Sequence, residues 1–336
     1  MARVLFTPHV GGLLVLIAVI VIAPYFFPSN FYFRIFALVW IASIAVVGLN
    51  LLMGYAGQVS LGHAGFYGIG AYAVAVLPHH FGVPSLIALV IGLVVAGGLA
   101  YLVGRPILRL KGHYLAVATL GMGILIAMVI TNEAQFTGGP DGMSVPRLEL
   151  FGERIRGSDT WYWISGATLV VICWLALNLV NSPTGRALRA VHDSEVAAQV
   201  NGIDIAREKL KVFVLSAVFA ALAGSYHAFM GPTITPVMAD FLHSIELVIM
   251  VVIGGMGSVF GSVVGAAFLV TLPQLLTVFD EYKFMMLGLL MMAFMIFLRD
   301  GIVPSLGKLL RGRFAPAKAE EPSSPKASEP SEAKPS

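Results

Sequence analysis

The chain has 336 residues, of which 58% are hydrophobic and 12% charged, and its formal net charge is +3. A soluble domain carries about 25% charged residues, whereas the mean hydropathy here is +0.87. These values exclude an ordinary soluble domain. They indicate one helical membrane domain over residues 10–300, preceded by a short segment (1–9) and followed by a tail (301–336).

The order of the apolar blocks predicts an all-α, polytopic membrane helix bundle of about ten spans, since a crossing helix needs about 20 apolar residues. Three blocks, at 61–77, 241–253 and 284–298, are short or broken by glycine, so half-helices or re-entrant segments are alternatives to full spans there. The expected spans are 10–27, 35–53, 61–77, 85–103, 114–130, 161–180, 212–229, 241–253, 259–279 and 284–298.

The basic residues predict the orientation. They lie between apolar spans, as the positive-inside rule describes, rather than on an amphipathic face that would bind nucleic acid. With the N-terminus inside, the outer segments hold five of the 21 Lys and Arg residues: Arg34, Arg147, Arg154, Arg156 and Lys283. Both termini are therefore expected in the cytoplasm, with a long outer loop at 131–160, a charged inner loop at 181–211, and a tail of disordered composition from about 315.

The stretch from Gly54 to Gly70 holds six glycines, together with Gln58, Ser60 and His63, between apolar spans. Glycine-interrupted segments of this kind point to transport pathways. Gln58, Ser60, Gly62 and His63 are therefore candidate residues of a translocation path, where the amide groups of a half-helix could attract a substrate carboxylate. Close helix packing through small residues explains the same pattern equally well, and the two interpretations are compatible.

Glu246 is the only acidic residue deep within an expected span, and it could pair with His243 three residues earlier. An ionisable residue at membrane depth is a functional candidate, although both side chains could instead lie at the outer interface beside Asp240. Gly257, Gly261 and Gly265 form a small-residue ridge expected to pack helices. The stretch 257–261 also echoes 57–62, which indicates either an internal repeat or chance similarity.

The chain contains no nucleotide-binding phosphate loop and no His-Glu-x-x-His sequence. Cys173 stands alone within an apolar run, so no disulfide, cysteine metal site or cofactor is expected. A proton-driven carrier usually needs a chain of buried ionisable groups, which this sequence does not provide. Transport driven by a separate energy-supplying subunit is therefore expected, and this chain is not expected to be an enzyme.

The inner loop predicts a protruding helix. Asp193 or Ser194 can cap a helix that begins near Glu195, and Gly202 is suited to end it. Such a capped helix could dock into a groove of a cytoplasmic partner, although a solvated connector is the alternative. Loops of this length are uncommon unless they have a function.

Several stretches together resemble the LivM-type permeases of bacterial ABC importers for branched-chain and other hydrophobic amino acids. These are 54–66 (GYAGQVSLGHAGF), 111–121 (KGHYLAVATLG), 137–142 (TGGPDG), 185–195 (GRALRAVHDSE) and 254–261 (GGMGSVFG). The resemblance implies an inner-membrane heterodimer with a LivH-type permease, two ABC ATPase subunits inside and a periplasmic substrate-binding protein outside. It further implies that the inner loop couples to the ATPases through Arg186, Arg189, Asp193, Glu195, Ala197, Ala198 and Gly202.

The sequence leaves three alternatives open. Similar permeases import urea or short amides, and the polar residues Gln58, Ser60 and His63 do not exclude such solutes. A stand-alone secondary carrier or channel is a rival from another class. An intramembrane enzyme is a third, supported only by isolated histidine and glutamate residues.

Overall fold

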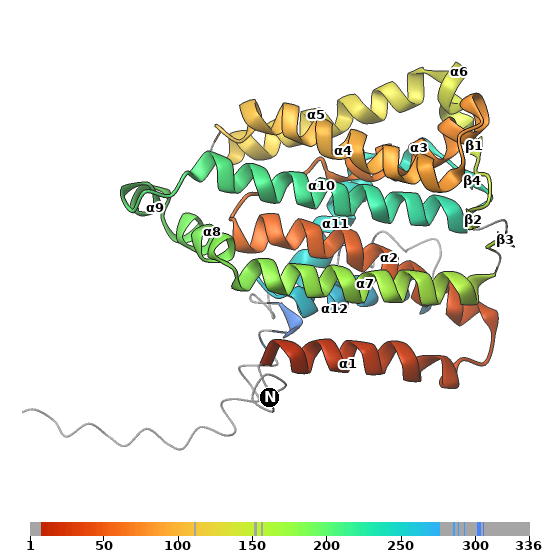
Figure 1. The fold of residues 1–336 in the computed structure, drawn as a ribbon, viewed down its shortest axis with the longest axis horizontal. Coiled ribbons are helices and arrows are strands. Elements are labelled where there is room, and N and C mark those ends of the chain that lie inside the picture. The colour runs from red at the N-terminus through yellow and green to blue at the C-terminus, as the bar shows by residue number, and fades with distance from the viewer. Residues whose placement is uncertain are drawn as a thin grey trace, which may run out of the picture.

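The computed structural model describes residues 8–110, 112–150, 153–155 and 157–275, and a few isolated positions after them (Figure 1). Its long helices correspond to the expected apolar spans. They are α1 (Pro8–Ile22), α2 (Asn30–Asn50), α3 (His63–Phe81), α4 (Ser85–Ile107), α5 (His113–Asn132), α7 (Ser158–Asn181), α10 (Ile205–Met230), α11 (Phe241–Gly254) and α12 (Val259–Leu275).

Shorter elements connect these helices. They are α6 (Ala134–Thr137), α8 (Pro183–Asp193), α9 (Glu195–Val200), one turn of π-helix (Leu51–Tyr55), and 3₁₀ turns at Ala23–Phe26, Gly139–Asp141 and Pro236–Ala239. The two-residue strands are β1 (Met143–Ser144), β2 (Glu149–Leu150), β3 (Glu153–Arg154) and β4 (Thr233–Ile234).

Five helical segments among the described residues are long and apolar enough to cross a membrane: Asn30–Tyr55, α4, α5, α7 and α10. The chain is thus an all-α, multi-pass membrane bundle. The helix α3 is continuous over 19 residues, so its glycine-rich break precedes the helix rather than interrupting it. The expected span at 284–298 lies outside the described residues except at isolated positions.

Two local features differ from the sequence-based expectations. The expected outer loop contributes to two small antiparallel sheets, one pairing β1 with β4 and the other β2 with β3. Positive φ values at Gly138, Gly139 and Gly142 turn the chain sharply before β1. The helix α10 also begins at Ile205, within the segment expected to be loop, because Asp204 caps it by accepting the amide N–H of Arg207 at 3.1 Å.

The centre of the bundle is formed by α2, α3 and α10, since 83% of the Asn30–Tyr55 window and 67% of the α10 window are buried, against 28% for α4 and α5. Glycines allow α3 and α10 to approach closely. A Cβ on Gly70 would lie 1.9 Å from the carbonyl oxygen of Ala221, and one on Gly224 would lie 1.9 Å from that of Tyr67. Small residues at helix crossings of this kind are typical of membrane proteins.

The two ends of the bundle differ. In Figure 1, α8 and α9 protrude at one end, where α1 and α10 begin and α4 ends. The four strands and α6 gather at the opposite end. The loops expected on opposite sides of the membrane therefore lie at opposite ends of the bundle.

Candidate functional site

The glycine-rich segment from Ala56 to Gly62 is a non-helical connection between the π turn and α3. Gly57 has a φ of 66°, a left-handed conformation that glycine adopts without strain. The amide of Gln58 donates to the carbonyl of Leu52 at 3.0 Å, and the amide of Leu61 donates to Thr119 Oγ1 at 3.1 Å. Protein groups thus accept the hydrogen bonds of two amides in this irregular segment, which is how non-helical backbone is tolerated within a membrane bundle.

His63 begins α3 and joins it to α10. Its Nδ1 lies 2.8 Å from Ser60 Oγ and its Nε2 lies 2.5 Å from Ser216 Oγ. The side chain is only 1% exposed. Because Ser216 lies near the middle of α10, the helix α3 starts about halfway along the bundle.

The other candidate residues of this segment differ in their contacts. Gln58 is 6% exposed; its Nε2 donates to the carbonyl of Ala56 at 3.0 Å, while its Oε1 has no hydrogen-bond partner among the described residues. A Cβ on Gly62 would lie 2.0 Å from the carbonyl oxygen of Thr119, so this glycine permits the crossing with α5. The amide of Ala64 already donates to Ser244 Oγ at 3.0 Å, which removes one group that a substrate carboxylate could use.

Glu246 lies apart from this segment, on α11. Its Oε2 is 3.1 Å from His243 Nδ1, so the expected pair is present, and the Glu246 side chain is 50% exposed. Asp240 caps α11 by accepting the amide of Phe241 at 2.7 Å. Next to the pair, Tyr67 OH lies 2.6 Å from His227 Nδ1. Within the described residues, no hydrogen bond joins Glu246 to the Gln58–His63 segment.

Asn50, which sequence reasoning did not single out, connects the two glycine-rich stretches. Its Nδ2 donates to the carbonyl of Ser258 at 2.9 Å and to Ser262 Oγ at 2.7 Å, and its Oδ1 accepts the amide of Gly257 at 2.9 Å. The side chain is 1% exposed. An amide near the end of an apolar helix is the signal that could have revealed it, because buried amides need partners.

The three glycines expected to form a packing ridge have two different roles. Gly257 has a φ of 77° and lies in the turn before α12. Gly261 and Gly265 lie on α12 and face α11, since Cβ atoms there would lie 2.5 Å from the Gly254 carbonyl oxygen and 2.0 Å from that of Met250. The ridge within α12 therefore consists of two glycines, because α12 begins only at Val259.

The helices α8 and α9 form a protruding hairpin. Serine side chains cap both: Ser182 Oγ and Ser194 Oγ each accept an amide N–H at 3.3 Å. After α9, Gly202 has a φ of 78°, and the amide of Ile203 donates to the carbonyl of Ala198 at 3.1 Å, as in a glycine-ended helix. The helix near Glu195 is thus confirmed with Ser194 as its cap, whereas α8 was not anticipated.

The hairpin residues expected to couple to the ATPases differ in how far they are exposed to solvent. Ala198 is buried at 1%, and Glu195 is half-buried. The others are exposed: Arg186, Arg189, Asp193, Ala197 and Gly202.

Two of the contacts between the hairpin and the rest of the bundle bear on its role. Lys209 Nζ on α10 lies 2.6 Å from Glu195 Oε1 on α9, with the lysine side chain 2% exposed. On the other side, a Cβ on Gly57 would lie 2.7 Å from His192 Cδ2. The glycine-rich break and the hairpin therefore meet directly. Lys209, a basic residue at the start of a long apolar helix, was the missed sequence signal.

Comparisons with known proteins identify the family of this chain. The family model described as the permease component of branched-chain amino acid transport systems matches residues 31–295. The LivM permease protein of the high-affinity branched-chain amino acid transport system of Escherichia coli is 35% identical over 92% of this chain and 78% of its own length. The corresponding LivM protein of Salmonella typhimurium is 35% identical over 82% of this chain and 70% of its length.

A LivH permease protein of Salmonella typhimurium is 24% identical over 78% of this chain and 90% of its own length. No solved structure shows significant similarity. The family model covers most of the chain, and its match includes both the glycine-rich break and the hairpin. The chain therefore belongs to the family of permease components of branched-chain amino acid transport systems.

Proposed function

We propose that this chain is the LivM-type subunit of an inner-membrane importer for branched-chain amino acids, driven by ATP hydrolysis in separate subunits. The similarity to LivM proteins supports the substrate class. The observation that carries the coupling role is the hairpin that contacts both α10 and the glycine-rich break. The chain itself contributes residues of the translocation path and a helical hairpin that transmits movement from the ATPases, rather than a catalytic site.

The partners follow from the same proposal. A LivH-type permease completes the pore, two ABC ATPases bind at the α8–α9 end, and a periplasmic substrate-binding protein binds at the opposite end. The hairpin end is the cytoplasmic one, and both termini lie in the cytoplasm. Support comes from α1 starting at the hairpin end (Figure 1) and from the concentration of basic residues in the segments of that side.

The exposed face of α9 suits a protein partner. Val196 and Val200 are 71% and 83% exposed, and four-residue spacing places them on one face of the helix. Ala198 packs inward. Exposed apolar side chains on a short helix outside the membrane are suited to dock into a groove of another protein.

In this mechanism, closure of the ATPases moves the hairpin as a unit. Glu195 transmits the movement to Lys209 and hence to α10, while His192 acts on the backbone at Gly57. Because Ser216 on α10 bonds His63, the start of α3 moves with α10. Gln58, Ser60, Gly62 and His63 thus respond to the hairpin, and we assign them with Glu246 to the translocation path.

A cross-linking experiment tests the hairpin. In a Cys173→Ala background, Val200→Cys is expected to form a disulfide or short-linker adduct with an ATPase subunit, and the adduct should change with ATP. Asp193→Cys is expected to react with an impermeant thiol reagent only in inside-out vesicles. Labelling of Asp193→Cys from outside intact cells would contradict the orientation and the coupling role together.

A transport assay tests the function. Vesicles that contain the chain with its cognate subunits are expected to accumulate radiolabelled leucine, isoleucine or valine only with internal ATP. Accumulation of urea instead would support the short-amide alternative. Gradient-driven flux through the purified chain alone would support a secondary carrier. Gln58→Leu is expected to raise the KM of uptake more than Gln199→Leu, an exposed glutamine on α9.

A further inference from the structure

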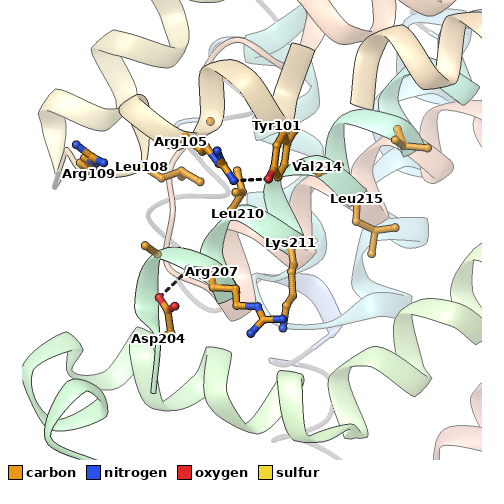
Figure 2. A pocket seen from close by; sticks show the side chains of 13 residues that line it. Tyr101, Arg105, Leu108, Arg109, Asp204, Arg207, Leu210, Lys211, Val214 and Leu215 are labelled. Carbon is orange, nitrogen blue, oxygen red and sulfur yellow. Dashed lines mark hydrogen bonds between the residues drawn. The ribbon is translucent and has the colours of Figure 1, made fainter. Parts of the chain in front are cut away.

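A groove of about 830 Å³ runs between the last turns of α4 and the first turns of α10 (Figure 2). The two helices meet at Gly104, where a Cβ would lie 2.9 Å from both Leu210 Cδ1 and Phe213 Cδ1. The groove has an aliphatic wall made by Leu108, Leu210, Val214, Leu215 and Val218. A wall of this chemistry is suited to hydrocarbon.

One end of the groove carries an excess of positive charge. Four basic residues and one acidic residue line it: Arg105, Arg109, Arg207, Lys211 and Asp204. The Asp204 carboxylate accepts the amide of Arg207, and Lys211 Nζ lies 2.6 Å from Glu208 Oε1. None of the three guanidinium groups forms an ion pair with a described residue, so their charge is available to a ligand.

Residue types that are typical of the boundary between headgroups and hydrocarbon line the groove. Arg105 donates a hydrogen bond to Tyr101 OH, and its Cζ lies 4.5 Å from the centre of the Tyr101 ring. Tyrosines and basic residues near the ends of membrane helices mark the interface. Further along α4, Val94 and Leu102 are 67% and 69% exposed, which continues the apolar surface away from the charged end.

We propose that this groove, which lies on the cytoplasmic side in the orientation of the proposed function, binds an anionic glycerophospholipid of that leaflet. The guanidinium groups of Arg105, Arg109 and Arg207 lie apart from one another in Figure 2, and those whose flexible side chains reach the lipid bind its phosphate oxygens in a bidentate manner. An acyl chain lies along the aliphatic wall at Val214 and Leu215. Phosphatidylcholine binds less well, because its ammonium group faces the same cations. Basic pockets between membrane helices on the cytoplasmic side recognise anionic headgroups for these reasons.

Native mass spectrometry of the full-length chain tests the proposal. Titration with phosphatidylglycerol and with phosphatidylcholine of the same acyl composition is expected to show at least a tenfold preference for the anionic lipid. Each basic residue near a membrane surface accounts for roughly a fivefold change in affinity. The Arg105→Gln, Arg207→Gln double variant should therefore bind phosphatidylglycerol about 25-fold more weakly, with a smaller loss for phosphatidylcholine, which carries the same phosphate but no net charge.

Two control variants test whether the position and the charge of these arginines cause the lipid preference. Arg147→Gln removes the same charge from an exposed position between β1 and β2, strands that lie at the other end of the bundle, and it should leave the lipid preference intact. The Arg105→Lys, Arg207→Lys variant keeps the charge and should retain most of the preference. Equal binding of the two lipids by the native chain would overturn the proposal, as would full retention of the preference in the double glutamine variant.

Two further experiments distinguish a bound lipid from a simple anion or a protein partner in the groove. Inorganic phosphate at the lipid's concentration should not displace phosphatidylglycerol; displacement would show a simple anion site and overturn the lipid assignment. In intact cells, benzoylphenylalanine in place of Leu215 should cross-link to a phospholipid. A cross-link to another protein chain would show that the groove is a subunit interface and would likewise overturn the proposal.

Discussion

The ammonium group of Lys209 on α10 lies 2.6 Å from the carboxylate of Glu195 on α9, and the lysine side chain is only 2% exposed. A buried ion pair is costly to break, because removal of one partner leaves the other charge without compensation. The pair joins the protruding hairpin to a helix in the centre of the bundle.

Lys209→Met should separate ATP hydrolysis from uptake. The substitution leaves Glu195 without its lysine partner, and loss of such a charged hydrogen bond costs about 1–3 kcal/mol. In the reconstituted transporter, ATP hydrolysis should continue while the amino acid transported per ATP falls severalfold. Lys209→Arg should restore part of the coupling, because it keeps the charge.

Glu208→Gln is the matched control for that change. It breaks the neighbouring pair with Lys211, whose side chain is 45% exposed, against 2% for Lys209, and an ion pair whose cation reaches solvent contributes less. Equal uncoupling by Glu208→Gln and Lys209→Met would contradict a specific role for the buried pair.

Gly57→Ala should impair transport through its contact with His192. An alanine there has a strained φ of 66° and a Cβ 2.7 Å from His192 Cδ2. Gly82→Ala introduces similar strain, at a φ of 63°, with nothing within 4 Å. Uptake should fall in the first variant at equal expression and remain near normal in the second.

A second substitution identifies the cause of that loss. In Gly57→Ala, His192→Ala, the histidine ring is removed, so uptake should recover in part and the two changes should be non-additive. Additive losses in the double variant would show that the contact between the break and the hairpin has no part in transport.

Asn50→Ala should destabilise the chain, because it leaves the amide of Gly257 without its partner and removes donors to Ser258 and Ser262. A buried group left unsatisfied costs about 1–3 kcal/mol. The single cysteine, Cys173, is fully buried, so a thiol-reactive fluorogenic dye reports unfolding in a thermal melt. Asn201→Ala, which removes only an exposed hydrogen bond, should leave the Tm nearly unchanged.

Gly70→Ala and Gly224→Ala should each lower the Tm, because the added methyl group would lie 1.9 Å from a carbonyl oxygen across the α3–α10 crossing. Overpacking a close contact costs about 1–3 kcal/mol or more. Gly98→Ala and Gly121→Ala are the matched controls, since nothing lies within 4 Å of a Cβ at either position. Equal melting temperatures for all four variants would contradict the tight crossing.

The candidate site was only partly predictable. Ser194, Glu195 and Gly202 were expected to define a short helix because capping depends on neighbouring residues in the chain. The helix α8 was missed, although Ser182 caps it in the same way. Pairing of His243 with Glu246 was anticipated from their three-residue spacing, since such spacing places them on one helix face.

The sequence by itself determined the class of protein, the approximate position of each described membrane helix, the caps of α9 and the family. Each depends on composition or on residues near one another in the chain. Only the tertiary structure decided that His192 contacts Gly57, that Lys209 pairs with Glu195, and that Asn50 binds the turn before α12. Those partners meet only when packed helices cross at specific glycines, and local sequence rules do not encode which helices cross.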